Sequence, residues 1–494
     1  MPKKNSFITV TDQFCGAGGS SQGASTAGAE IKLALNHWAL AIETHNTNFP
    51  NTLHECTDIS ACNPRRYPST DILITSPECT NHSLAKGRKA VTSQMDMFNT
   101  GVLDASAERS RATMWDVPRF AEYHSYNAII VENVVDARRW VLFDAWLSAM
   151  HALGYSHKCV YFNSRHFHPT PQTRDRMYVN FWKTKNKAPQ LDYSPLAYCP
   201  SCKSDVYSIQ TWKNQGKKSG KYKQQYVYCC PVHNQVVEPY YYAAYNCIDW
   251  SNIGKRIEDR KTPLSSNTVK RINHGLAKYG SKPILVHNFS NGYSSSVHEP
   301  TGTITTVDKH ALLTPFLVHN FTPGYTSAVT APTGTITTSD QHALLVPPPM
   351  VILNEHTKSE GYVRSVAEPV QTQATRQTLS ILTPPQFIQN GKIDTQAFNA
   401  FIHYNYGQTT LAHISDPMGA CTTVGKESLV TYKEPTIEEC YYRMLKPDEI
   451  KLAMAFDKDY KVVGSGKVQV KQLGNAVTPP VMKWIVQQVI QSLS

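Results

Sequence analysis

The chain has 494 residues, of which 41% are hydrophobic and 18% charged, and its formal net charge is +11. This composition excludes a disordered chain, and the length predicts about two or three domains. No signal peptide and no apolar run of about eighteen residues occurs, so we expect a soluble protein without membrane contact. Twelve cysteines in so long a chain do not make a disulfide framework, and the positive charge permits a polyanionic partner without requiring one.

A glycine-rich loop is the first candidate binding segment. We predict a strand at Phe7–Val10, then the loop D-Q-F-C-G-A-G-G-S-S-Q-G at residues 12–23, then a helix that ends near Ala29. The glycines let the backbone turn tightly and approach a ligand, and a loop that leads into a helix N-terminus suits the charged group of a nucleotide-like cofactor. An ordinary turn would explain the same glycines, so both interpretations stay open.

Two acidic residues follow at positions that suit a cofactor. The sequence predicts a strand at Trp38–Ile42 that ends at Glu43, where a carboxylate would bind ribose hydroxyls. Asp58 comes next in the alternation of strands and helices. Alone, both would be solvated surface carboxylates. In this alternation they predict a doubly wound, Rossmann-like α/β sheet with a cofactor cleft.

Cys79 comes just after a predicted buried strand at 71–75, which ends because the following Ser-Pro pair cannot continue the hydrogen-bond ladder. Open α/β sheets place their chemistry at the carboxyl ends of strands, so Cys79 is a candidate nucleophile. A lone cysteine is more often a small buried hydrophobe. A second apolar strand, at 127–131, ends at Glu132, which we expect to face the cleft.

Gln172, Arg174 and Arg176 alternate along a predicted extended segment, which sends their side chains to one face. Such a face could bind an anionic group. The alternative is a basic edge strand that resists aggregation.

Together these segments resemble the DNA cytosine-C5 methyltransferase family, because the family's motifs occur in the family's order. They are Phe14-Cys15-Gly16-Ala17-Gly18-Gly19, Cys79 after its strand and proline, Glu132-Asn133-Val134, Q-T-R-D-R at 172–176, Y-R-M-L-K-P-D-E-I at 442–450 and G-N-A-V at 474–477. The resemblance implies a methyl donor, S-adenosylmethionine, bound by Phe14, Gly16, Gly18, Gly19, Glu43, Asp58, Asn475 and Val477. It implies catalytic roles for Cys79, Glu132, Arg174 and Arg176.

The implied reaction begins when a cytosine flips out of double-stranded DNA. The Cys79 thiolate adds to C6, Glu132 neutralises charge that develops toward N3, and the arginines hold O2 and the phosphate. C5 then takes the methyl group. The basic segment 86–113 resembles a mobile loop that could close over DNA, with a passive surface loop as the alternative.

One departure concerns the neighbours of the nucleophile. Glu78 and Thr80 stand where the family has proline and glutamine. A carboxylate that pointed at the thiol would raise the pKa of Cys79, so we expect Glu78 to turn away. The threonine leaves open how the loop is held after the base flips.

The middle of the chain contains two C-P-x-[Cys/His] knuckles, which predict a structural zinc ribbon at 196–236. The predicted ligands are Cys199, Cys202, Cys230 and His233, with Cys229 as a spare unless it replaces Cys230. Lysines lie between the knuckles together with Trp212, Tyr222 and Tyr226. This stretch could follow phosphates and stack on bases, or it could be a solvated loop.

An internal repeat with a period of about 32 residues follows. P-T-G-T-I-T-T occurs at 300–306 and 332–338, and H-A-L-L at 310–313 and 342–345, with weaker copies elsewhere. We expect a β-rich array at 255–432, which reads bases or only supports the zinc ribbon. The predicted domains are a catalytic domain of residues 1–182 and 440–494 and a target-recognition domain of residues 183–439.

The leading hypothesis is a DNA (cytosine-5-)-methyltransferase. The alternatives are the same fold acting on RNA, another C5 pyrimidine modification, an amino-methylating enzyme, or a catalytically weakened zinc-containing DNA-binding protein. The S-P-E-C run disfavours the amino-methylating enzyme because a cysteine stands where that class has none. We expect a DNA-associated monomer in the cytoplasm of a bacterial or phage-infected cell. A companion restriction endonuclease is left open.

Overall fold

The structure is a computed structural model that describes residues 7–77, 113–249, 440–494 and short stretches between 252 and 438. The chain forms two compact units. One unit comprises residues 1–250, 285–312 and 444–494, and the other comprises 251–284 and 313–443. Cys79, Glu78, Thr80 and nearly all of segment 86–113 lie outside the described residues.

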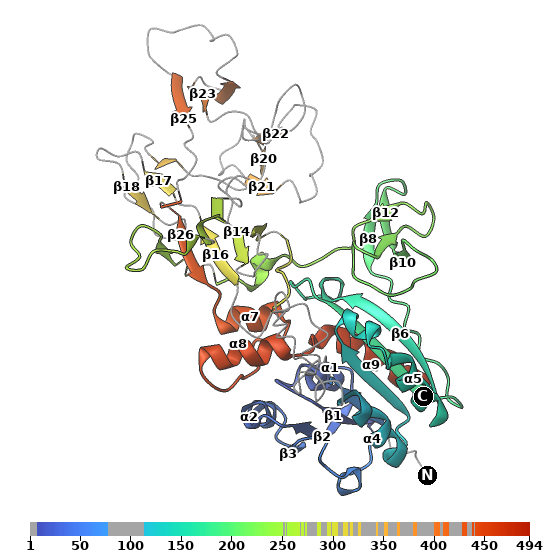
Figure 1. Cartoon of the computed structure of the whole chain (residues 1–494). Helices are drawn as coiled ribbons and strands as arrows, with labels where there is room; N and C mark the ends of the chain where they lie inside the picture. Colours follow the sequence, from blue (N-terminus) through green and yellow to red (C-terminus); the bar gives the residue numbers. More distant parts are fainter. Residues whose placement is uncertain are drawn as a thin grey trace, which may run out of the picture. The chain divides into compact units, whose positions relative to one another are not determined.

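The first unit is built on a seven-stranded sheet with the order β3-β2-β1-β4-β5-β7-β6. Figure 1 labels β1, β2, β3 and β6 of this sheet. Its strands are β1 Thr9–Gln13, β2 Glu30–Asn36, β3 Leu53–Cys56, β4 Ile72–Thr75, β5 Ala128–Asn133, β6 Tyr155–Asn163 and β7 Asp175–Lys183. The first five are parallel, whereas β7 runs antiparallel to both β5 and β6. The strand order reverses between β1 and β4, and such a reversal is where open α/β sheets bind ligands. The α/β prediction is confirmed for this mainly parallel sheet.

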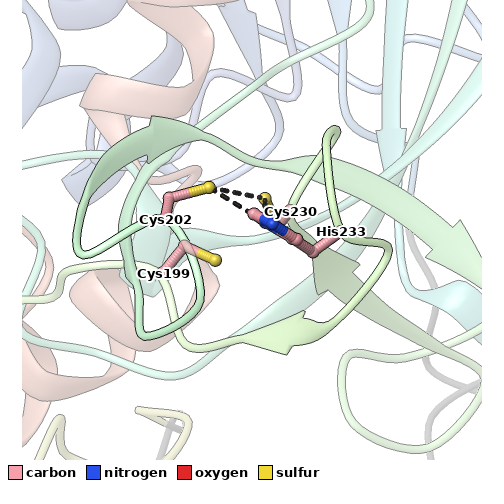
Figure 2. Close-up of side chains that lie close together, drawn as sticks. All are labelled: Cys199, Cys202, Cys230 and His233. Atoms are coloured by element: carbon pink, nitrogen blue, oxygen red, sulfur yellow. Dashed lines mark hydrogen bonds between the residues drawn. The ribbon is translucent and has the colours of Figure 1, made fainter.

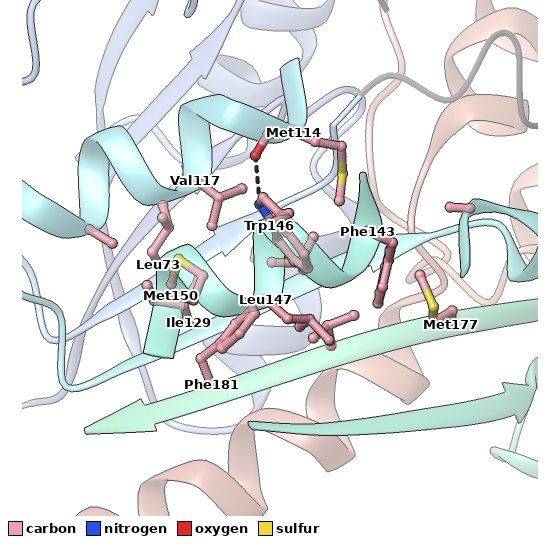
Figure 3. Packing of buried hydrophobic residues seen from close by; sticks show 14 of the residues in the cluster. Leu73, Met114, Val117, Ile129, Phe143, Trp146, Leu147, Met150, Met177 and Phe181 are labelled. Atoms are coloured by element: carbon pink, nitrogen blue, oxygen red, sulfur yellow. Dashed lines mark hydrogen bonds between the residues drawn. The ribbon is translucent and has the colours of Figure 1, made fainter. Parts of the chain in front are cut away.

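Helices cover both faces of the sheet. They are α1 Gly19–Thr26, α2 Ala39–Asn48, α4 Asp116–His124, α5 Phe143–Ala152 and α9 Pro479–Leu493. Two further helices, α7 Pro447–Ala453 and α8 Gly466–Asn475, pack on each other in a separate core cluster. On one face, Leu73 and Ile129 pack under α4 and α5 around Trp146, whose indole N–H donates to the Met114 carbonyl at 2.9 Å (Figure 3). On the other face, the alternate residues Ile72 and Ile130 pack against α9. Strands buried on both faces explain the continuous apolar runs in the sequence.

Several predicted elements are confirmed and one is wrong. The strands predicted at 71–75 and 127–131 are β4 and β5, and the predicted C-terminal helix is α9, which docks on the N-terminal sheet. The strand predicted at Trp38–Ile42 is wrong, because these residues lie at the start of helix α2. The strand in this region is β2, which ends six residues before the predicted strand does. Short apolar runs do not distinguish a strand from a helix.

The segment between the knuckles forms two small sheets. β8 Leu196–Cys199 pairs with β9 Ser204–Tyr207, and β11 Tyr226–Cys229 lies between β10 Ile209–Trp212 and β12 Val236–Val237. Cys199 and Cys230 lie in a buried cluster with Ala197 and Val237. This small core belongs to the first unit.

In each of four successive copies of the repeat, the first strand lies between the other two. The first copy is part of a five-stranded sheet with the order β13-β26-β16-β14-β15, and the next three are antiparallel three-stranded sheets, β18-β17-β19, β21-β20-β22 and β24-β23-β25. Their strands are Ile284–His287, Ser294–Ser296 and His310–Thr314; Leu317–His319, Tyr325–Ser327 and His342–Ala343; Met350–Leu353, Val363–Ser365 and Leu379–Leu382; Ala400–Asn405, Thr409–His413 and Glu427–Thr431. The expectation of short β-strands is therefore confirmed for these four copies. In the second unit, β13 Lys255–Arg256 also pairs with β26 Tyr441–Met444.

Among the described residues, none of the helices is both long and apolar enough to cross a bilayer.

Candidate active site and metal site

The two candidate chemical loops begin side by side at the reversal of strand order. Gln13, the last residue of β1, pairs with Thr75, the last residue of β4, and the Ser76 N–H donates to the Gln13 carbonyl at 3.3 Å. The glycine-rich loop therefore leaves the sheet beside the segment that leads to Cys79. Sequence reasoning placed both loops at the carboxyl edge, and the strand order explains why they are neighbours.

Glu132 and Asn133 are the last residues of the next strand, β5. Thr75 pairs with Val131, so Glu132 is one residue further along the same edge. The Asn133 side chain donates to the carbonyl of Pro77, two residues before Cys79, at 3.4 Å. Asn133 thus holds the start of the Cys79 loop beside Glu132, which is a role that the sequence did not reveal.

The two candidate arginines have different surroundings. Arg176 forms an ion pair with Glu132, with 2.9 Å between Nε and Oε1. Arg174 is 4% exposed, and its guanidinium donates to the carbonyl of Gly474 at 3.1 Å and to that of Ile304 at 3.4 Å. Arg176 therefore lies at the candidate site, whereas Arg174, just before β7, bonds to the last turn of α8 and to the first repeat.

The first P-T-G-T-I segment pairs with the Q-T-R segment. The Thr301 N–H donates to Pro171 at 2.8 Å, the Thr173 N–H donates to Thr301 at 2.7 Å, and the Thr303 hydroxyl donates to Thr173 at 3.0 Å. Gln172 and Thr301 are both fully buried there. The first repeat thus belongs to the compact unit that contains the catalytic motifs, and its contacts fix the strand that begins at Asp175.

The glycine-rich turn is shaped by close contacts. Gly16 and Gly18 have φ values of 53° and 85°, in the left-handed region that favours glycine. A Cβ on Gly19 would overlap the carbonyl oxygen of Val477. The G-N-A-V segment at 474–477, which is predicted to contact the cofactor, therefore touches the turn through Val477. Phe14, half-buried, begins the turn.

Asp12 is a site residue that sequence reasoning missed. It lies near the end of β1, is fully buried, and accepts hydrogen bonds from the hydroxyls of Ser20 and Ser21, both at 2.6 Å. Burial raises the pKa of Asp12 to about 6, although the two serines lower it. Its second carboxylate oxygen has no hydrogen-bond partner among the described residues. The signal in the sequence was an acidic residue just before F-C-G-A-G-G.

The predicted ribose-binding carboxylates lie on the surface. Glu43 is exposed in helix α2, so the argument that placed it at the end of a strand does not hold. His37 and Trp38 instead follow β2 directly. Asp58 is exposed two residues after β3, where its carboxylate accepts the Ser60 N–H at 3.0 Å.

The four predicted metal ligands come together (Figure 2). One ligand atom from each of Cys199, Cys202, Cys230 and His233 lies within 4.8 Å of the others. The Cys202 sulfur is 3.6 Å from the Cys230 sulfur and 3.1 Å from Nδ1 of His233. Around a tetrahedral zinc with Zn–S bonds of about 2.3 Å, neighbouring sulfurs lie about 3.8 Å apart, so the set fits this ion.

The crowded ligand groups shift one another's pKa in opposite directions. Burial and the neighbouring thiols Cys230 and Cys199 raise the pKa of Cys202 to about 12. Burial opposes ionisation of Cys230 as well, but hydrogen bonds from the backbone and ring of His233 lower its pKa to about 6. Cys229 pairs with Ile209 within the small sheet and does not belong to the cluster. The structure thereby resolves the choice between Cys229 and Cys230.

The lysine-rich hairpin between the knuckles docks beside the catalytic motifs. The Tyr222 N–H donates to Asp175 at 2.9 Å, and Lys221 lies 3.3 Å from Asp136. Tyr222 and Tyr226 are buried in the same core as β5 and β7. Tyr222 and Tyr226 therefore pack against the sheet and are not available to stack on bases. Lys213, Lys217, Lys218 and Lys223 are exposed, so phosphate contact and a solvated loop both remain open for them.

Comparison with known proteins gives a family match over most of the chain. The model for C-5 cytosine-specific DNA methylases matches residues 8–274 and 339–491. The chain is 28% identical over 176 residues to the type II methyltransferase M.HgiDI of Herpetosiphon aurantiacus, which is 35% of this chain and 51% of that protein. It is 36% identical over 85 residues to M.HgiGI, a type II methyltransferase of the same organism, which is 16% of this chain and 67% of that protein. The chain thus spans about half of the length of M.HgiDI.

Solved structures also match, at low identity. A DNMT2 variant of Spodoptera frugiperda aligns with a TM-score of 0.46 and 12% identity, over 98% of this chain and 99% of that one. Dnmt2 of S. pombe aligns with a TM-score of 0.43 and 11% identity, over 98% and 97%.

Proposed function

The chain belongs to the C-5 cytosine-specific DNA methylase family, and from this premise we propose that it methylates C5 of a cytosine in double-stranded DNA. The observation that carries the proposal is the meeting of three segments at one sheet edge. They are the glycine-rich turn after β1, the segment after β4 that leads to Cys79, and Glu132 at the end of β5. Asn133 links the last two through Pro77.

The residues at this edge suit addition to a pyrimidine ring. The Cys79 thiolate attacks C6, which makes C5 nucleophilic, and the thiolate leaves when the C5 proton is lost. Glu132, oriented by Arg176, takes the position from which it hydrogen-bonds the base at N3. Arg176, which is ion-paired with Glu132, would add positive charge that stabilises the negative charge developing on the ring. Because these groups cannot reach a stacked base, the target cytosine must leave the duplex.

S-adenosylmethionine fits the turn after β1. When bound, it supplies an electrophilic methyl group on a positively charged sulfur. Gly16 and Gly18 let the backbone approach such a ligand, and the unpartnered oxygen of Asp12 is a buried acceptor at the base of the turn. Asn475 and Val477 form the opposite wall, since Val477 contacts Gly19. Phe14 lines the start of the turn. His37 and Trp38 directly follow β2 at the carboxyl edge of the sheet, whereas Glu43 lies within α2, so His37 and Trp38 are the better candidates for the ribose side.

We also propose that Cys199, Cys202, Cys230 and His233 hold a structural zinc ion. The ligand set is complete, and two of its members, Cys199 and Cys230, belong to a small buried core. Four protein ligands leave no open position for a reacting water. Zinc would therefore hold together the ends of a hairpin that docks on Asp175 and Asp136.

Transfer of a tritiated methyl group to mixed-sequence duplex DNA tests the proposed reaction. The wild-type chain should label DNA as 5-methylcytosine, and Cys79→Ser should not. Cys56→Ser is the matched control, because Cys56 is an exposed free thiol on β3, and it should keep full activity. Label that persists in Cys79→Ser would exclude the covalent route. A wild-type chain that binds S-adenosylmethionine but labels RNA and not DNA would overturn the proposal that DNA is the substrate.

A further inference from the structure

Four polar side chains form one hydrogen-bonded chain behind the glycine-rich turn. The Ser21 hydroxyl donates to Asp12 at 2.6 Å, Nε2 of His45 lies 2.8 Å from that hydroxyl, and Nδ1 of His45 lies 2.8 Å from Nε2 of His54. These residues come from β1, α1, α2 and β3. Asp12, Ser21 and His45 are fully buried, and His54 is half-buried.

The direction of the hydrogen bonds follows from counting protons. Ser21 has one hydroxyl proton and gives it to Asp12, so the bond between Ser21 and His45 requires a proton on Nε2 of His45. Because burial lowers the pKa of His45 to about 3, the ring is neutral and its Nδ1 accepts from His54. Among the three fully buried members, the only charge is that of Asp12.

The same histidine touches the glycine-rich turn. A Cβ on Gly18 would lie 3.1 Å from Cδ2 of His45 and would overlap the hydroxyl of Tyr460, which donates to the Ala17 carbonyl at 2.5 Å. The ring therefore lies directly beneath the turn, while its Nε2 reaches Ser21 in the first turn of α1. One side chain thus supports the turn and links it to the buried carboxylate.

We propose that His45 is a positioning residue of the cofactor site, which keeps Asp12 ionised beneath the turn so that it favours a positively charged cofactor. This inference rests on the proposed function, in which the cofactor carries sulfonium and ammonium charges. Without the donor at Nε2 of His45, the Ser21 hydroxyl is free to turn away, and its bond to Asp12 weakens. The hydrogen bonds that stabilise the Asp12 carboxylate are then weaker, so the effect of burial increases and favours the neutral acid.

The other titratable groups around this chain stay neutral near pH 7. Burial, and next the charge of Asp12, raise the pKa of Cys15 well above its usual value. Burial chiefly raises the pKa of Tyr460, with Cys15, Asp12 and Asp457 adding to it. Burial lowers the pKa of His54, which faces His45. Asp12 is therefore the group whose ionisation limits cofactor affinity on the acid side.

Calorimetric titration of S-adenosylmethionine into the full chain, from pH 5.5 to 8.5, tests the proposal with two variants. In the wild-type chain, affinity should fall as the pH drops through about 6, the pKa of Asp12. In His45→Leu this midpoint should rise by about one unit, which makes affinity about threefold weaker at pH 6.5 and equal at pH 8.5. His45→Gln keeps an N–H donor near the position of Nε2 and should behave as the wild type.

The outcomes separate the role of His45 from the function of the site. Equal weakening of His45→Leu at every pH, or the same loss in His45→Gln, would show that the ring only fills space and would overturn the proposal. If His45→Leu does not fold, as thermal melting would show, Ser21→Ala interrupts the same chain and should give the same upward shift; an unshifted midpoint there would overturn it. A wild-type chain that binds no S-adenosylmethionine at any pH would overturn the proposed function and this inference with it.

Discussion

Arg176 and Glu132 form an ion pair, with 2.9 Å between Nε and Oε1, across the neighbouring strands β7 and β5. Their side chains are only 18% and 10% exposed, so the pair lies in a protected environment. Asp175, next to Arg176, accepts the N–H of Tyr222 from the lysine-rich hairpin. Glu132 is therefore oriented before any substrate arrives, by contacts that extend from the sheet to the metal-site hairpin.

The orientation of Glu132 makes the first prediction. Glu132→Gln keeps the size of the side chain but removes the carboxyl group that we propose exchanges a proton with the base. Since general acid–base groups contribute about 10²–10⁴-fold, the methyl-transfer rate should fall by at least about 10²-fold. Glu122→Gln, on the exposed side of α4, is the matched control and should be unchanged. Single-turnover kinetics with saturating DNA measures the effect, and a loss below about tenfold would contradict the role.

Arg174 gives a prediction about stability. Its buried guanidinium donates to the Gly474 and Ile304 carbonyls, and Arg174→Met leaves both without this donor. Hydrogen bonds to charged groups contribute about 1.5–3 kcal/mol, so the free energy of unfolding should fall by about 2–3 kcal/mol. Arg139→Met removes an arginine that is 82% exposed and should cost under about 0.5 kcal/mol. Urea denaturation compares them, and equal midpoints would refute the structural role of Arg174.

The substitution Gly19→Ala tests the contact between the glycine-rich turn and Val477 at the proposed cofactor site. In Gly19→Ala, the new methyl group would overlap the Val477 carbonyl and lie 3.1 Å from the ring of Phe456, so the turn must open. We expect at least about tenfold weaker S-adenosylmethionine binding, because a displacement of one wall removes about 1.4 kcal/mol or more. Gly216→Ala, where the nearest atom is 3.4 Å away, should bind normally. Unchanged binding by Gly19→Ala, measured by calorimetry, would place the cofactor elsewhere.

The elements that sequence reasoning placed correctly have local signals. β4 and β5 are continuous apolar runs because both faces of the sheet are covered, and the knuckles contain their ligands at fixed spacing. Helix α2 was missed because its buried face includes the polar residues Thr44 and His45, so its periodicity looks weak. The docking of Tyr222 on Asp175 joins residues 47 positions apart, and no local pattern encodes such a contact.

Metal removal is the last prediction, and the adjacent cysteines make it specific. Cys230 is a member of the ligand cluster, whereas Cys229 pairs with Ile209 in the hairpin and is not. Cys230→Ser should therefore reduce the zinc content from about one ion per chain to near zero, because structural sites of this type need all four ligands. Cys229→Ser should retain the ion, despite a loss of stability from its buried position. Mass spectrometry of the native protein or a colorimetric chelator measures the metal.

The same pair of variants also tests what the metal does for catalysis. Loss of zinc frees the ends of the hairpin that contacts Asp175 and Asp136, so Arg176 and Glu132 lose part of their support. Cys230→Ser and the chelated wild-type chain should therefore lose methyl transfer while they still bind S-adenosylmethionine, because the glycine-rich turn is held by Val477 and His45 on other elements. Zinc retained in Cys230→Ser would exclude the proposed ligand set. Full methyl transfer by a zinc-free chain would show that the hairpin keeps its docked position without the ion.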